Sequence, residues 1–225
     1  MENRILPPEI IEAFKELDTS EVADAVNRFG INTGMFGIKS VVPGTKLCGQ
    51  AFTCLFGVCA AGQEGKMDYL DDVPAGHVVV IDNDGRLDYS CWGDLMSRVA
   101  MRNGVNGTVA DGIVRDVNDI REMKYPTFAR ATHMWTGKMH SYLEAVQVPI
   151  RIAGVKVNPG DLIIGDDTGV LSVPFELAEK VLEAAQEIRE REKVIEGFIQ
   201  QGMRLDEARE ATGYYFLQEA KKAQK

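Results

Sequence analysis

Cysteine and histidine are scarce in this chain of 225 residues, which holds four of the former and three of the latter. The cysteines form no Cys-x-x-Cys pair, and no histidine stands at zinc-finger spacing from them. They are Cys48, Cys54, Cys59 and Cys91. This pattern argues against a disulfide framework or a structural zinc site, and it predicts reduced thiols that serve as small core residues.

Long hydrophobic runs are also missing. The longest uninterrupted apolar segments, such as residues 78–81, are far shorter than the ~20 residues that a membrane span needs. The first residues, up to Pro7 and Pro8, contain no apolar segment of the kind that a secretory signal carries. We therefore expect a cytoplasmic protein with no membrane partner.

Positive charge is in deficit, because 25 lysines and arginines face 34 aspartates and glutamates, for a net charge of −9. An acidic chain without a dense basic cluster repels phosphate backbones, so we expect no nucleic-acid partner. No glycine-rich loop after a strand is followed by an acidic residue that would bind a nucleoside cofactor, which argues against a methyltransferase.

Apolar periodicity outlines the fold. Residues 10–17 and 22–29 carry apolar side chains at helical spacing, and residues 18–21 between them form a predicted N-cap. From Pro43 onward, short β-rich runs alternate with turn residues, and two helical segments lie among them. The predicted strands are 51–56, 77–81, 107–110, 149–152, 161–164 and 170–173, and the predicted helices are 94–102 and 117–123. This order indicates a layered α/β or α+β fold.

The C-terminal part is helical. After Pro174, positions 181, 185, 188, 192, 195 and 199 form an apolar seam at steps of four and three, in which Glu192 is the one charged residue. A further amphipathic segment, 204–217, is expected to pack on a neighbouring subunit. We predict one domain over residues 1–225, with a helical tail from about residue 175.

Residues 92–119 are the best candidates for chemistry. The strand 107–110 is predicted to run into a turn at Asp111 and Gly112, and Arg115 and Asp116 then begin a helix. Arginine can bind a carboxylate with two parallel N–H bonds, and aspartate can hold a hard divalent cation. On the residues alone, capping carboxylates and a surface ion pair are the more ordinary explanation of these residues and of Asp94.

These residues carry a resemblance to a known family. Asp94, twenty intervening residues and then Arg115-Asp116-x-x-Asp119 resemble the signature of the class II pyruvate aldolases that act on 4-hydroxy-4-methyl-2-oxoglutarate and 4-carboxy-4-hydroxy-2-oxoadipate. The wider superfamily includes the regulator of ribonuclease E activity A. Further blocks resemble the family in the right order, namely 20–25, 49–53, 126–130, 158–162 and 165–170.

The resemblance implies a β/β/α-layered swivelling domain of the phosphohistidine-domain type, with N-terminal helices and a long C-terminal helical extension. It implies a homotrimer or a dimer of trimers with active sites between subunits. In that arrangement Asp116 would bind Mg²⁺ or Mn²⁺, Arg115 would bind the pyruvyl oxygens, and Asp94 would orient waters near the metal. By position, Glu192 would be supplied by a neighbouring subunit.

The resemblance also implies where a substrate carboxylate binds. Backbone N–H groups at the start of the helix after Gly93, at Asp94, Leu95 and Met96, would help Arg115 hold it, since helix N-termini suit anions. A divalent cation chelated by a 2-keto acid would offset the negative charge of an enolate, and Asp94 or Glu192 would relay a proton through water. The implied activity is metal-dependent retro-aldol cleavage of a 4-hydroxy-2-oxo diacid to release pyruvate, together with oxaloacetate decarboxylation.

Other functions remain open at this stage. A Schiff-base aldolase would need a desolvated lysine, and Lys156 is the only strand-like candidate, although a solvated edge position explains it better. The segment 131–140 resembles the aldolases least, and its two histidines, one tryptophan and one lysine could line a substrate pocket or a surface loop. A non-catalytic regulator that binds a ribonuclease or another protein is the competing class.

Overall fold

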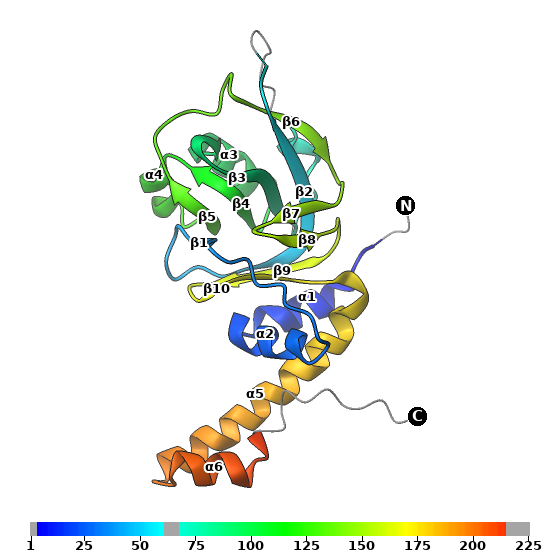
Figure 1. The fold of residues 1–225 in the computed structure, drawn as a ribbon, viewed down its shortest axis with the longest axis vertical. Helices are drawn as coiled ribbons and strands as arrows, with labels where there is room; N and C mark the ends of the chain where they lie inside the picture. Colours follow the sequence, from blue (N-terminus) through cyan, green and yellow to red (C-terminus); the bar gives the residue numbers. More distant parts are fainter. Residues whose placement is uncertain (1–3, 61–67, 215–225) are drawn as a thin grey trace.

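The computed structural model describes residues 4–60 and 68–214. In Figure 1 a body of strands lies above a set of helices, and the long helix α5 leads away from that body. The helices are α1 (Pro8–Lys15), α2 (Thr19–Asn27), α3 (Asp94–Arg102), α4 (Val117–Glu122), α5 (Ala178–Gln200) and α6 (Leu205–Ala211). The strands are β1 (Lys39–Ser40), β2 (Leu47–Val58), β3 (Val78–Trp92), β4 (Gly107–Val114), β5 (Thr127–Thr132), β6 (Ser141–Val146), β7 (Ile150–Ile152), β8 (Val155–Val157), β9 (Leu162–Asp166) and β10 (Gly169–Val173).

The centre of the main sheet is parallel. Its strands follow the order β1-β5-β4-β3-β2-β9-β10, with β6 also paired to β2, and β2, β3, β4 and β5 run in the same direction. The apolar run in β3 explains why the centre of the sheet is parallel. Val78 and Val80 belong to one core cluster, whereas Val79 and Ile81 belong to another, on the opposite face of the strand. A strand that is apolar on both faces needs cover on both sides, as parallel sheets have.

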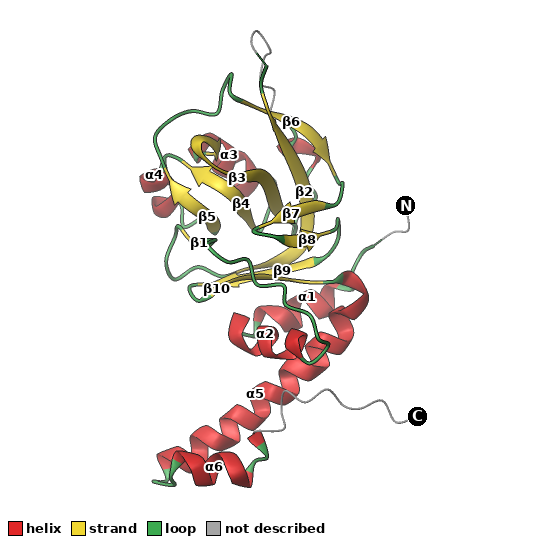
Figure 2. Ribbon diagram, viewed as in Figure 1, coloured by secondary structure: helices red, strands yellow, loops and turns green. Residues whose placement is uncertain are grey.

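That cover comes as layers (Figure 2). Helices α3 and α4 and the short η1 turn (Leu70–Asp72) pack on one face of the parallel strands, while the β7–β8 hairpin and β9–β10 enclose the other face. The strand β9 then serves two cores, because Ile163 faces the sheet cluster whereas Leu162 and Ile164 face α1, α2 and α5. The prediction of a mixed, layered α/β fold is confirmed.

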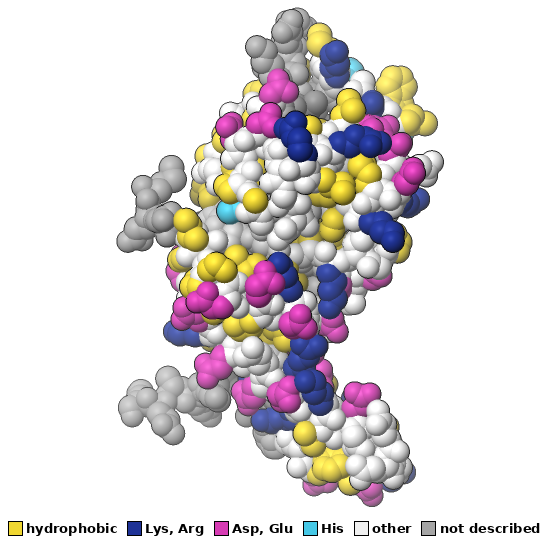
Figure 3. Space-filling model, turned by 180° about the vertical axis from the view of Figure 1, so that it is seen from behind, with side chains coloured by type: hydrophobic (Ala, Val, Ile, Leu, Met, Phe, Trp, Pro, Cys, Tyr) yellow, Lys and Arg dark blue, Asp and Glu magenta, His cyan; other side chains and the backbone are white. Residues whose placement is uncertain are grey.

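Helix α5 follows the predicted seam only in part. Val181, Ala185, Ile188 and Ile195 are buried, whereas Glu192 and Ile199 are exposed. The lower lobe in Figure 3, where α6 packs back against α5, shows hydrophobic atoms at its surface. Helix α6 ends at Ala211, short of the predicted end at 217, and residues after 214 lie outside the described part of the chain.

The predicted turn at Asp111 and Gly112 is wrong, because both residues lie inside β4, which continues to Val114. Asp111 is buried, and its carboxylate accepts hydrogen bonds from the Arg130 side chain and from the backbone N–H of Ala153. Partners on distant segments therefore satisfy an aspartate that, taken alone, looks like a turn residue. Strand β3 likewise runs past a bulge as far as Trp92 and pairs with β4 to its end.

The cysteines behave as predicted. Cys48, Cys54 and Cys91 are buried and Cys59 is half-buried, all as free thiols. Burial raises the pKa of Cys48 and of Cys91 to about 12, so neither thiol ionises readily near neutral pH. Across the residues that the structure describes, no helix has the length and apolar character needed to cross a membrane.

Asp166 fastens the helical layer to the sheet, and its replacement tests that role. It is buried at the end of β9, where Oδ2 accepts the Thr19 N–H (2.9 Å) and Oδ1 accepts the Thr19 hydroxyl (2.7 Å) and the Thr168 N–H (2.8 Å). Asp166→Asn places an N–H donor against one of these donors. We expect it to lower the free energy of unfolding in urea by about 1–3 kcal/mol.

The same contact carries a pH signature. Burial alone would raise the pKa of Asp166, but the hydrogen bonds from Thr19 and Thr168 outweigh it and hold the pKa below its ordinary value. The stabilisation is therefore complete above about pH 4 and is lost as the pH falls through the lowered folded-state pKa. The difference in the free energy of unfolding between the wild type and Asp166→Asn should become smaller below about pH 4. The control is Asp167→Asn, because Asp167 is an exposed neighbour whose carboxylate accepts the Gly44 N–H. An equal loss of unfolding free energy in this variant would contradict the role of Asp166 in fastening the helices to the sheet.

Candidate active site

The candidate site lies where three neighbouring parallel strands end. Trp92 and Val114 are register partners at the ends of β3 and β4, and the N–H of Arg115 donates to the carbonyl of Trp92 (3.1 Å). On the other side, the N–H of His133 donates to the carbonyl of Val114 (3.1 Å). Gly93, Arg115 and His133 therefore follow one another across the carboxyl edge of the sheet, the usual ligand-binding edge of α/β folds.

A buried aromatic pair fixes the turn from β3 into α3. Trp92 stacks on Tyr125 with ring centroids 6.2 Å apart, and its indole N–H donates to the hydroxyl of Ser97 (2.8 Å). That hydroxyl donates in turn to the carbonyl of Gly93 (3.0 Å). The first turn of α3 is thereby held against the sheet edge, with its N–H groups at Asp94, Leu95 and Met96. Such groups lack intrahelical acceptors and carry partial positive charge.

Arg115 and Asp116 form an ion pair at this edge, with Arg115 Nε 2.9 Å from Asp116 Oδ2. Asp116 occupies the N-cap position of α4 in the left-handed region (φ 56°) and makes no capping hydrogen bond through its side chain. A Cβ at Gly93 would lie 2.9 Å from Asp116 Oδ2 and 3.3 Å from Arg115 Cγ. A side chain at 93 would therefore displace this pair from its present geometry. The Arg115 and Asp116 side chains are 37% and 30% exposed.

Arg98 pairs with Asp94 and Asp119, and the sequence did not lead us to predict it as a site residue. Its guanidinium lies 3.5 Å from an oxygen of Asp94 and 3.7 Å from an oxygen of Asp119. The signal was available, because Arg98 stands four residues after Asp94 on one helix face. Asp94 is the first residue of α3 rather than its cap, and Arg98 links α3 to α4 beside the Arg115–Asp116 pair.

The donor set fits a hard divalent cation. No three acidic, histidine or cysteine side chains come together as a metal cage anywhere in the described ranges 4–60 and 68–214. A cation at this edge would be held by one or two carboxylates, with Asp116 in the gap that Gly93 leaves open and Asp94 near it. Mg²⁺ is commonly bound in this way, with water and substrate oxygens completing its shell, whereas zinc usually takes histidine or cysteine.

Glu192 does not join the other predicted site residues within one chain. It lies on α5, which packs against α1 and α2, beside a groove of about 490 Å³ that Glu21 and Arg189 also line. Partial burial raises the pKa of Glu192, and the nearby carboxylates of Glu21 and Asp24 raise it further. Lys156 is exposed on β8, so it lacks the desolvation that a Schiff-base lysine requires.

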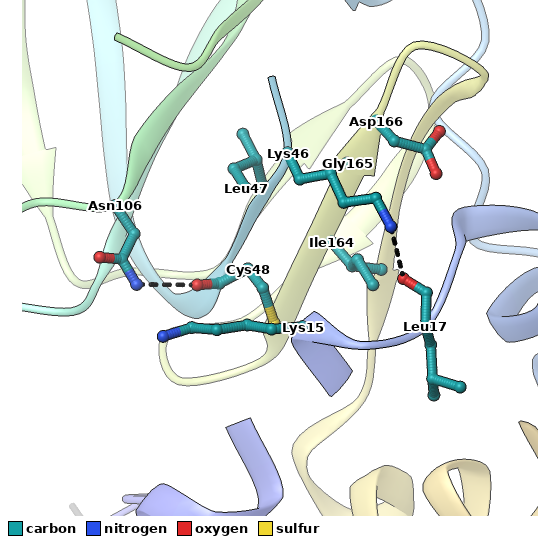
Figure 4. A pocket seen from close by; sticks show the side chains of 9 residues that line it. All are labelled: Lys15, Leu17, Lys46, Leu47, Cys48, Asn106, Ile164, Gly165 and Asp166. Carbon is teal, nitrogen blue, oxygen red and sulfur yellow. Dashed lines mark hydrogen bonds between the residues drawn. The ribbon is translucent and has the colours of Figure 1, made fainter. Parts of the chain in front are cut away.

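A second hollow, of about 280 Å³, lies far from this edge (Figure 4). Asn106, which lines it, stands just before β4 and so marks the opposite end of that strand from Arg115. The two lysines beside the hollow are paired with carboxylates, Lys15 with Glu12 (2.6 Å) and Lys46 with Asp18 (2.5 Å). Their charge is already matched by acidic partners, so we assign this hollow no ligand.

Two curated relatives are similar to this chain in sequence. Protein DlpA of Legionella pneumophila is 37% identical over 206 residues, which is 90% of this chain and 34% of that protein, so the chain spans about a third of this relative's length. A protein of Halalkalibacterium halodurans, provisionally named a 4-hydroxy-4-methyl-2-oxoglutarate aldolase, is 30% identical over 178 residues, or 79% of this chain and 82% of that protein.

The fold has a solved counterpart, and a family model matches the region of the site. The crystal structure of an uncharacterized protein from Pseudomonas syringae pv. tomato superposes with a TM-score of 0.86 at 38% identity, covering 91% of this chain and 98% of that one. The RraA-like model, described as Aldolase/RraA, matches residues 19–172, which include the whole Asp94–Asp119 segment. These matches confirm the predicted resemblance, and the chain belongs to the RraA-like family.

Proposed function

We propose that this protein is a metal-dependent carbon–carbon lyase that cleaves a 4-hydroxy-2-oxo diacid to release pyruvate and also decarboxylates oxaloacetate. One observation carries the proposal: Arg115 and Asp116 form an exposed ion pair against Gly93, beside the N-terminal turn of α3. This arrangement brings together the guanidinium of Arg115, the carboxylate of Asp116 and the N–H groups of the first turn of α3 at one edge of the sheet. The aldolase name of the Halalkalibacterium relative supports the same reaction class.

The reaction needs two kinds of help, and the chain can supply both. The bond between C3 and C4 breaks, its electrons pass into the C2 carbonyl, the C4 hydroxyl loses its proton, and C3 is then protonated to give pyruvate. Arg115 binds the 2-keto acid oxygens, and the N–H groups of Asp94, Leu95 and Met96 bind the carboxylate. Mg²⁺ or Mn²⁺ at Asp116 would supply Lewis-acid stabilisation of the developing negative charge.

Proton transfer falls to two carboxylates. Asp94 orients water at the sheet edge, and Glu192 of a neighbouring subunit takes the hydroxyl proton through water. In this proposal the chain works as a homotrimer or a dimer of trimers of swivelling domains. The exposed apolar side chains of the α5–α6 lobe, among them Val194, Ile199 and Leu205, support burial there by a second subunit.

Replacing Asp116 tests the activity. Pyruvate release should be measured by coupling to lactate dehydrogenase, with oxaloacetate or 4-hydroxy-4-methyl-2-oxoglutarate and with Mg²⁺, Mn²⁺ or EDTA. We expect turnover only with metal, and Asp116→Ala should lower kcat/KM by about 10²-fold or more because the cation loses its carboxylate. A folded wild type without turnover would contradict the lyase and favour a protein-binding regulator, whose partner binding would survive Asp116→Ala.

Replacing Gly93 tests the geometry of the site. In Gly93→Ala the new methyl group meets Asp116 Oδ2, so the ion pair must move. We expect the Mn²⁺ concentration for half-maximal activity to rise at least about tenfold, while the circular dichroism spectrum stays that of the wild type. Gly169→Ala is the matched control, because a Cβ there meets nothing within 4 Å. If Gly93→Ala and Gly169→Ala need the same Mn²⁺ concentration for half-maximal activity, the placement of the metal at Asp116 beside Gly93 would be contradicted.

Complementation tests the division of the site between subunits. Asp116→Ala and Glu192→Ala should each be nearly inactive alone. When the two are unfolded together and refolded, random mixing joins an intact Asp116 to a neighbour's intact Glu192 in about one site in four, so roughly a quarter of wild-type activity should return. Asp116→Ala mixed with Asp94→Ala is the control, since both lesions lie in the same half-site. No recovery in the first mixture would mean that Glu192 serves its own chain or has no role.

A further inference from the structure

His133 stands immediately beside Arg115 at the candidate site. Thr132 is the register partner of Val114, and the His133 N–H donates to the Val114 carbonyl, so the next residues on each strand are neighbours. Neighbouring strands lie about 4.8 Å apart, which places the ends of β3 and β5 roughly two such spacings from each other with Arg115 between them. A short dicarboxylate can bridge that distance.

The imidazole of His133 is oriented by its own loop. Its Nδ1 accepts the backbone N–H of Trp135 (3.3 Å), so the proton of the neutral ring is carried by Nε2. Nε2 has no hydrogen-bond partner within the described ranges, and it donates in both the neutral and the protonated form of the ring. This leaves one N–H at the sheet edge for a ligand.

The loop that carries His133 is held in place by several contacts. The Trp135 carbonyl accepts the N–H of Ser90 (3.1 Å), and Gly137 packs so closely on the Ser90 carbonyl that a side chain there would clash. Tyr89 stacks on His140 with ring centroids 3.6 Å apart and meets Trp135 edge-on at 6.5 Å. The loop is therefore anchored to β3, and this anchoring fixes the position of His133.

Negative charge gathers on the side of α3 away from His133, so an anionic ligand group is favoured on the His133 side. Leu95 and Met96 border a hollow of about 390 Å³ whose remaining lining includes Asp68, Asp71 and Asp72. Arg102 pairs with Asp71 (2.5 Å), so the other two carboxylates keep this hollow acidic. A second carboxylate on the substrate would be repelled there, whereas the Nε2–H of His133 would bind it.

From this geometry we infer that His133 determines specificity, by binding through Nε2–H the carboxylate at the end of the substrate remote from its 2-keto acid group. The inference rests on the proposed function and assigns the recognition of the second carboxylate of its diacid substrate to one side chain. It also gives a role to the segment 131–140, which resembles the aldolases least. His133 acts on binding, so its loss should appear mainly in KM and only for substrates that carry the second carboxylate.

A pair of matched substrates tests the inference. 4-Hydroxy-2-oxoglutarate and 4-hydroxy-2-oxopentanoate undergo the same cleavage and differ only in a carboxylate or a methyl group on C4. The wild type should prefer the diacid by at least about tenfold in kcat/KM. His133→Ala should lower kcat/KM for the diacid about tenfold and change that for the monoacid less than about twofold. His133→Gln, which keeps an N–H donor, should recover part of the loss.

The control is Met134→Ala, because this exposed side chain of the same loop takes no part in the anchoring contacts and its loss should leave the substrate ratio unchanged. If the wild type cleaves both substrates and His133→Ala lowers both equally, or lowers neither, the inference is overturned while the lyase stands. An equal change of the ratio in Met134→Ala would assign the effect to the loop as a whole and overturn the role of His133. If the wild type cleaves neither substrate, both proposals fail.

Discussion

The shared register of β3, β4 and β5 is the constraint on which the site depends. Two backbone hydrogen bonds, from Arg115 to Trp92 and from His133 to Val114, bring three strand ends to one edge. Apolar side chains on both faces of these strands drive the sheet into the interior, and its layers of cover follow from that. The carboxyl edge is then a place on the parallel strands where polar side chains can meet a ligand without being buried.

Sequence patterns predict those parts of the molecule whose causes are local. The helix at 94–102 was predicted with the bounds it has, since its polar start and its apolar spacing both lie within nine residues. The end of β4 was misplaced because Asp111 is paired with Arg130 and Ala153, which are distant in sequence. Strands β5 and β6 were not predicted at all. β5 is short and becomes partly exposed toward its end, so its own apolar signal is weak.

In the candidate site, too, the residues with local signals were predicted, and those that depend on distant segments were not. Arg115, Asp116 and Asp94 were predicted from their place after a strand and from the resemblance to a family signature, and they lie at one edge of the sheet. Arg98 and the requirement for glycine at 93 depend on how close two segments approach, which a sequence does not show. Glu192 was noticed as a charge in an apolar seam, and it proves to be exposed among other carboxylates. Within one chain the groove beside Glu192 is also lined by the basic side chains of Arg189, Lys193 and Arg209. In the proposed assembly a neighbouring subunit would set Glu192 beside Arg115.

The left-handed backbone of Asp116 has a consequence for how this sequence can change over time. Most residues are strained at a φ of 56°, but asparagine adopts that conformation about as readily as aspartate does. The exchange of one for the other removes the negative charge and leaves the turn into α4 intact. Under the proposed function, a descendant with this exchange would lose the carboxylate proposed for the cation in a single step, while its fold and its outer surface stay as they are.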